Sequence, residues 1–106
     1  MEYMRRNGYD VKHYATVLGA IRDLVDDRVS PLGYFVDMKL EDDLGGSERF
    51  CNFIKCGSYK KPFFFITGSI SEHDKEVHKR TQTEVYSKLF VMRNFDYFKH
   101  KIEQNQ

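Results

Sequence analysis

The sequence lacks tryptophan, has only two cysteines and two prolines among 106 residues, and carries almost no net charge. Lysine and arginine together number 17 against 16 aspartates and glutamates, so composition gives no reason to expect a polyanionic partner. No apolar run approaches the roughly 20 residues that cross a membrane, and the first residues lack the apolar core of a signal peptide. We therefore expect no membrane partner.

The two cysteines, Cys51 and Cys56, are five residues apart. In the β-strand that we predict for this segment, they point to opposite faces and lie about 16 Å apart, at about 3.3 Å per residue. A disulfide bridges a much shorter distance, and no other cysteine is present to complete a zinc site. Two free thiols suit a reducing compartment, so we expect a cytoplasmic, intracellular protein.

Aromatic residues are abundant, with nine phenylalanines and seven tyrosines, and hydrophobic residues make up 41% of the chain. This is too apolar for a disordered chain and enough for one modest core. We predict a single domain over residues 1–106, with residues 1–9 and 103–106 flexible at its ends.

The pattern of apolar residues predicts a helix between Asp10 and Ser30, followed by a strand over residues 34–40 with one buried face. Residues 48–70 are typical of a hairpin, with arms at 48–56 and 63–70 around the basic turn Lys60–Pro62. Ser71 then opens a C-terminal helical region, in which we predict a kink near Asn94. The predicted fold is therefore α+β, a helix, a three-stranded antiparallel sheet and a helix (αβββα).

The second arm of this hairpin, Phe63–Ile66, is apolar on both faces, so both must be covered. Either the C-terminal helix covers the second face, through Phe95, Phe98 and Ile102, or a partner does. We favour the helix, because its own apolar residues also need burial. If the face stays open, Phe35 and Phe53 could line a platform on which single-stranded nucleic acid stacks.

The αβββα order, over roughly residues 10–90, resembles the double-stranded RNA-binding domain. That family carries a lysine-rich run at the start of its last helix, aimed at the phosphates across the major groove. The corresponding segment here, residues 71–80, contains Lys75, Lys79 and Arg80 but interleaves three acids that would repel phosphate. The resemblance is one of element order, and we carry no function over from it.

Three histidines fall in the C-terminal part of the chain: His73, His78 and His100. The first two are about 140° apart around a helix, so they cannot share a metal ion. Asp74 lies one turn before His78 and could orient its imidazole. A small ribonuclease could use His78 with Lys79 or Arg80 as a phosphate clamp, but we favour an ordinary solvated helix face.

The acidic loop Glu41, Asp42 and Asp43 has consecutive acids, whereas a calcium loop alternates its ligands. Neither glycine-rich phosphate fingerprint is present, and nothing resembles a nucleophile elbow or a serine triad. We therefore expect no catalytic residue, no cofactor and no metal, and do not expect an enzyme.

These observations predict a binding protein, most simply a small protein-binding regulator or inhibitor. Its size and lack of motifs are analogous to those of phage-encoded antagonists of host systems, although no residue carries that comparison. A nucleic-acid-binding module and a His-dependent ribonuclease are the alternatives, and a homodimer through residues 63–70 is left open. The predicted contact residues lie in the hairpin, the first strand and the acidic loop: Phe35, Glu41, Asp42, Asp43, Arg49, Phe53, Lys55, Tyr59, Lys60 and Lys61.

Overall fold

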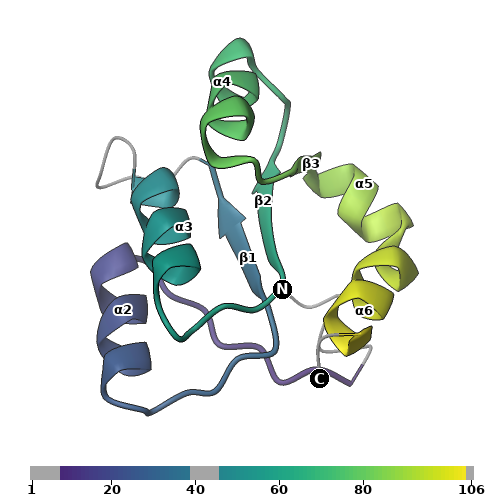
Figure 1. The fold of residues 1–106 in the computed structure, drawn as a ribbon. Helices are drawn as coiled ribbons and strands as arrows, with labels where there is room; N and C mark the ends of the chain where they lie inside the picture. Colours follow the sequence, from purple (N-terminus) through teal and green to yellow (C-terminus); the bar gives the residue numbers. More distant parts are fainter. Residues whose placement is uncertain (1–7, 39–45, 105–106) are drawn as a thin grey trace.

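A computed structural model describes residues 8–38 and 46–104 of the chain. Strands and helices alternate along it (Figure 1). The elements are α2 (Val17–Val25), β1 (Tyr34–Asp37), α3 (Gly46–Cys56), β2 (Phe63–Thr67), α4 (Glu72–Thr81), β3 (Val85–Ser87), α5 (Lys88–Arg93) and α6 (Phe95–Gln104). The prediction of mixed helix and sheet is confirmed.

The three strands form a parallel sheet in the order β1-β2-β3. Tyr34 pairs with Phe63 and Phe65 pairs with Val85, so all three strands run in one direction. A helix separates each strand from the next and returns the chain to the starting edge, as a parallel pair requires. The predicted antiparallel sheet and αβββα order are wrong, and with them the resemblance to the double-stranded RNA-binding domain.

The largest error concerns residues 48–56, which form helix α3 rather than the first arm of a hairpin. Apart from the first residue, Gly46, its buried residues are Ser47, Phe50, Cys51 and Ile54, and their spacing of three, one and three places them on one helical face. Phe50 and Ile54 fit an alternating strand pattern as well as a helical one. Local pattern therefore could not decide between the two structures.

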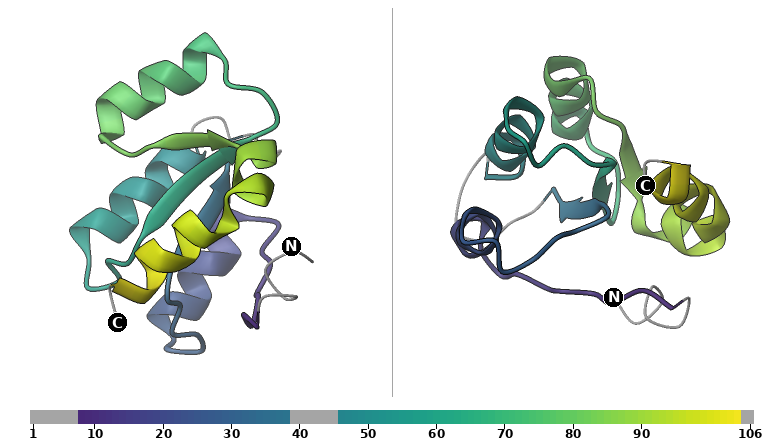
Figure 2. Two further views of the ribbon diagram at one scale, coloured as in Figure 1. Left: turned by 90° about the vertical axis from the view of Figure 1, so that its right-hand side faces the viewer. Right: turned by 60° about the horizontal axis from the view of Figure 1, so that its bottom comes forward.

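Helices α2 and α3 cover one face of the sheet, where the core contains Leu24, Val36, Phe50, Ile54 and Phe65 (Figure 2). Helix α2 begins after the N-cap Thr16, later than the predicted start at Asp10. Tyr34 and Val36 of β1 are buried, as the alternation of the first strand predicts.

Helices α5 and α6 cover the opposite face, where Phe64 and Ile66 of β2 meet Phe95, Phe98 and Ile102. The expectation that the C-terminal helix covers this face is confirmed, as is the break at Asn94, which is the C-cap of α5. Neither face of the sheet is left as an open platform for nucleic acid.

Two further features of the C-terminal part follow from local sequence. The predicted capping box of Ser71 and Asp74 is present, since each side chain accepts a hydrogen bond from the other's backbone N–H group. Val85–Ser87 forms strand β3, where helix was predicted. In residues 8–38 and 46–104, no helix has the length and apolar character needed to cross a membrane.

Candidate functional site

The carboxyl ends of the three strands meet at one edge of the sheet because the strands are parallel. In open parallel sheets, ligands bind outside these ends at the point where the strand order reverses. The order β1-β2-β3 has no reversal, so the case for this edge depends on its side chains. β1 ends at Asp37, β2 ends at Thr67, and β3 ends at Ser87, which Lys88 follows. We call this group of residues the carboxyl edge.

An ion pair joins the two outer strands at the carboxyl edge, with Lys88 Nζ 2.9 Å from Asp37 Oδ2. β1 and β3 flank β2, so their backbones lie about 10 Å apart at the usual strand spacing. The lysine side chain therefore reaches over the end of the central strand. The two side chains are 36% (Asp37) and 52% (Lys88) exposed, so solvent and small solutes reach both groups.

The connection that follows β2 leaves backbone accessible to a ligand beside this ion pair. Thr67 is fully buried, and its hydroxyl donates to the carbonyl of Ser69 at 3.2 Å. A Cβ atom added to Gly68 would meet nothing within 4 Å. A ligand at the carboxyl edge can therefore approach the chain at Gly68 without displacing a side chain.

The end of β1 is tied to the start of α3. Ser47 Oγ donates to the carbonyl oxygen of Asp37 at 2.6 Å, and Ser47 itself is buried. This bond fixes the backbone of Asp37, and the carboxylate of the same residue pairs with Lys88. The predicted acidic loop, Glu41–Asp43, connects these elements and lies outside the described residues.

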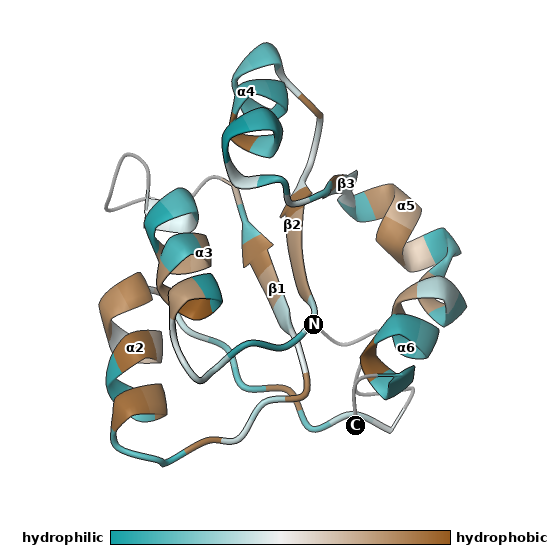
Figure 3. Cartoon of the chain, viewed as in Figure 1, coloured by the Kyte–Doolittle hydropathy of each residue, from teal (hydrophilic) through white to brown (hydrophobic). Residues whose placement is uncertain are grey.

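A second feature, next to the carboxyl edge, is the apolar exterior of α5. Leu89, Phe90 and Met92 are 54%, 42% and 54% exposed, and Tyr97 of α6 is 45% exposed. Tyr86 of β3 stacks on Phe90 with a ring separation of 5.5 Å. Figure 3 shows α5 as mainly hydrophobic where α4 is mainly hydrophilic. We call these five residues the α5 surface.

Polar contacts orient the two tyrosines of the α5 surface. Their hydroxyl oxygens lie 3.5 Å apart, and Lys101 Nζ lies 5.1 Å from the centre of the Tyr97 ring. Burial raises the pKa of Tyr86. The pKa of Tyr97 is lowered, first by its hydrogen bond with Tyr86 and then by Lys101. The surface therefore offers polar groups for hydrogen bonds beside its apolar area.

The structure separates the residues that sequence reasoning placed together. Phe53 and Tyr59 do stack, with ring centroids 5.5 Å apart, next to the exposed Lys60 and Lys61. These residues lie at the amino end of β2, opposite the carboxyl edge. Phe35 packs under α6 on the other face of the sheet. Two of the predicted contact residues, Arg49 and Lys55, lie on the exposed side of α3. The ammonium group of Lys55 donates a hydrogen bond to the carbonyl of Thr81.

Lys79 and Arg80, the predicted phosphate clamp of a His-dependent ribonuclease, both pair with acidic residues of the chain. Arg80 binds both carboxylate oxygens of Glu48 at 3.0 Å, which lowers the pKa of Glu48, and Lys79 faces Glu76 at 3.9 Å. His78 Nδ1 lies 2.8 Å from the carbonyl of Thr83. Over the described ranges, no three His, Cys, Asp or Glu side chains gather as a metal site would require.

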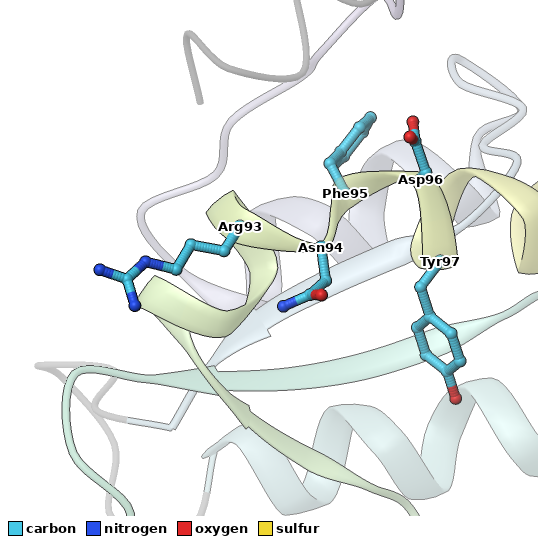
Figure 4. A pocket seen from close by; sticks show the side chains of 5 residues that line it. All are labelled: Arg93, Asn94, Phe95, Asp96 and Tyr97. Atoms are coloured by element: carbon cyan, nitrogen blue, oxygen red, sulfur yellow. The ribbon is translucent and has the colours of Figure 1, made fainter.

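A hollow of about 220 Å³ opens at the junction of α5 and α6 (Figure 4). The side chains around it diverge: Phe95 and Asp96 point to one side, and Asn94 and Tyr97 point to the other. They do not converge on a common point, so we do not place a ligand there.

Sequence reasoning misses the carboxyl edge because it predicts residues 48–56 and 63–70 as an antiparallel pair of strands. The signal that could have indicated it is a polar residue at the end of each apolar segment: Asp37, Thr67 and, directly after β3, Lys88. No protein-family model matches the sequence, and no curated protein sequence matches it either.

Proposed function

We propose that the chain is a small protein-binding regulator or inhibitor, without turnover of its own, whose binding is controlled by a phosphoryl group on Asp37. The α5 surface is its contact with the partner protein. One observation carries the proposal: Lys88 is both the ion-pair partner of Asp37 and the first residue of α5. A change at the carboxylate therefore reaches the start of the helix that bears the apolar surface.

A covalent phosphoryl group suits the carboxyl edge better than a bound phosphate ion. A free phosphate would need to take Lys88 from Asp37 and would then lie beside a carboxylate of like charge. Transfer of a phosphoryl group to Asp37 removes this repulsion, because the carboxylate itself becomes bonded to the phosphorus. The new phosphoryl oxygens then become the partners of the ammonium group, and the accessible backbone at Gly68 adds room for them.

The transfer step is a simple exchange of bonds. A carboxylate oxygen of Asp37 attacks the phosphorus of an acyl phosphate, the bond from phosphorus to the donor's acyl oxygen breaks, and the donor's carboxylate leaves with the electron pair. One mixed anhydride replaces another, so the step needs no other source of energy. Lys88 offsets the charge on the transferred group.

We place this regulator inside the cell, in a reducing compartment, in keeping with the free thiols Cys51 and Cys56. The contact surface differs from the hairpin that the sequence suggested. β2 lies between β1 and β3, and both of its edges are paired, so the proposal does not use a homodimer through residues 63–70.

The test is to incubate the chain with acetyl phosphate and Mg²⁺ and to measure its intact mass. We expect a gain of one phosphoryl group that hydroxylamine removes, and no gain in Asp37→Asn. The double variant Lys60→Glu with Lys61→Glu, at the other end of the sheet, should gain as the natural chain does. Hydrogen exchange should change in residues 88–93 on modification.

A mass gain that persists in Asp37→Asn, or no gain in the natural chain, would contradict the proposal that a phosphoryl group on Asp37 controls binding.

The nucleic-acid alternative predicts a different result. It requires retardation of single-stranded RNA or DNA that falls steeply with salt and is lost in the Lys60/Lys61 double variant.

A further inference from the structure

We infer that the occupant of the α5 surface is a short peptide segment of the partner, which crosses the edge strand β3 and anchors an apolar side chain on each side of it. This inference rests on the proposed function for the role of the surface and goes beyond it in naming the kind of ligand.

β3 is an edge strand, paired with β2 alone among the described residues. Neighbouring residues of a strand point to opposite faces, so Val85 and Tyr86 belong to different sides of the sheet. Tyr86 lies in the α5 surface. Val85 lines a hollow of about 240 Å³ between α4 and β3. A segment that covers the outer edge of β3 therefore meets the hollow on one side and the α5 surface on the other.

The hollow has the size and lining of a binding pocket for one side chain of a peptide. Ile70 and Val85 supply its apolar part, and the rest of its lining is polar or charged: Asp74, Lys75, His78 and Glu84. Its volume is below the roughly 300–1,000 Å³ of a pocket for a whole small-molecule ligand. A single anchor residue, with polar neighbours on the same peptide, fits this arrangement.

The exposed area favours a peptide over a second copy of the chain. The four most exposed side chains of the α5 surface are each about half accessible, which amounts to about 100 Å² per side chain and about 400 Å² in all. A stable complex of folded proteins buries about 800 Å² on each partner. β3 has three residues, too few to hold two sheets together by backbone bonds.

The experiment is to pan a phage-displayed library of short random peptides on the immobilised, unmodified chain. We expect enriched sequences with two apolar anchors. Their affinity should fall by about tenfold or more in Leu89→Glu, on the α5 surface, and in Ile70→Glu, in the hollow. The matched control is Leu18→Glu on α2, since Leu18 is 67% exposed and belongs neither to the α5 surface nor to the lining of the hollow. Thermal melting should show that all three variants fold, because each change is at an exposed position.

Three results would overturn the inference: no enriched peptide, enriched peptides that bind the Leu89 and Ile70 variants as well as the natural chain, or a dimer in sedimentation that Leu89→Glu dissociates. The last would assign the surface to a second copy. Modification of Asp37 is measured without peptide, so either proposal can fail while the other stands.

Discussion

The two ends of the sheet are built differently, although the same three strands supply both. At the amino end, Gly33 is crowded, since a Cβ there would come within 3.2 Å of both Ile102 and the carbonyl of Pro62. The buried Tyr34 donates its hydroxyl to the carbonyl of Tyr59 at 2.8 Å. At the carboxyl end, Gly68 has open space, and the charged pair of Asp37 and Lys88 is partly exposed.

From this difference we expect the amino end of the sheet to contribute mainly to stability and the carboxyl end mainly to function. The amino end is packed and satisfied by groups of the chain itself, so changes there should mainly affect folding. The carboxyl end presents charged groups that solvent reaches, so changes there should affect binding and modification more than folding. The four predictions below are given in descending order of expected effect. Those on the two glycines, Tyr34 and Asp37 test this division, and the one on Ser71 tests the capping of α4.

Alanine at the two glycines should give opposite results. Gly33→Ala should lower the free energy of unfolding by about 1–3 kcal/mol, because the new methyl group overpacks against Ile102 and backbone. Gly68→Ala should be neutral or stabilise by up to about 1 kcal/mol, because it restricts the unfolded chain without a clash. Urea denaturation of both variants measures the difference, and equal effects would contradict the contrast between the two ends.

Tyr34→Phe should cost about 1 kcal/mol, because the carbonyl of Tyr59 loses its donor. Burial raises the pKa of Tyr34 to about 12, against about 10 in the unfolded chain. Its contribution is therefore complete below pH 10 and is lost as pH rises from about 10 to about 12.

The gap in stability between Tyr34→Phe and the natural chain should narrow over that range. The gap is the quantity to measure, since the hydrogen bond to Asp23 also raises the pKa of Tyr14 to about 12 and affects both proteins alike. A constant gap up to pH 12 would show that Tyr34 titrates normally.

Ser71→Ala should cost about 1 kcal/mol by removing the N-cap of α4. The loss should be local, with faster amide exchange in the first turn of α4 and unchanged exchange in α3. Ser71→Asp keeps a capping oxygen and serves as the control; a loss as large as that of alanine would mean that capping is not the cause.

Asp37→Asn should change stability least, by less than about 1 kcal/mol, because both members of its ion pair are partly exposed. Modification by acetyl phosphate should nevertheless be abolished. Chemical denaturation alongside intact-mass measurement separates the two effects. A large loss of stability would move Asp37 from the functional to the structural part of the molecule.

Several elements were predictable from local pattern. β1 and β2 showed alternating or continuous apolar runs, the capping box of Ser71 opened α4, and Asn94 marked the break before α6. The burial of Phe95, Phe98 and Ile102 over the sheet followed from their need for cover. Each of these features depends on residues close together in the sequence.

The elements that were missed depend on distant contacts. Residues 46–56 fit either a helix or a strand, and only their packing between α2 and the sheet selects the helix. β3 has three residues and forms only because β2 offers an edge with which it can pair. With one helix taken as a strand, the sheet became antiparallel, and the polar residues that follow the strands no longer met at one edge.

The sequence by itself determined which residues are apolar enough to be buried, where α4 begins and α5 ends, and that Phe63–Ile66 is covered on both faces. Only the tertiary structure decided the direction of the strands, and with it the meeting of Asp37 and Lys88, which are 51 positions apart in the chain. The physical reason is that hydrophobic pattern and capping act over a few residues. Strand direction instead depends on which connecting segment folds as a helix, and that is settled by packing across the whole domain.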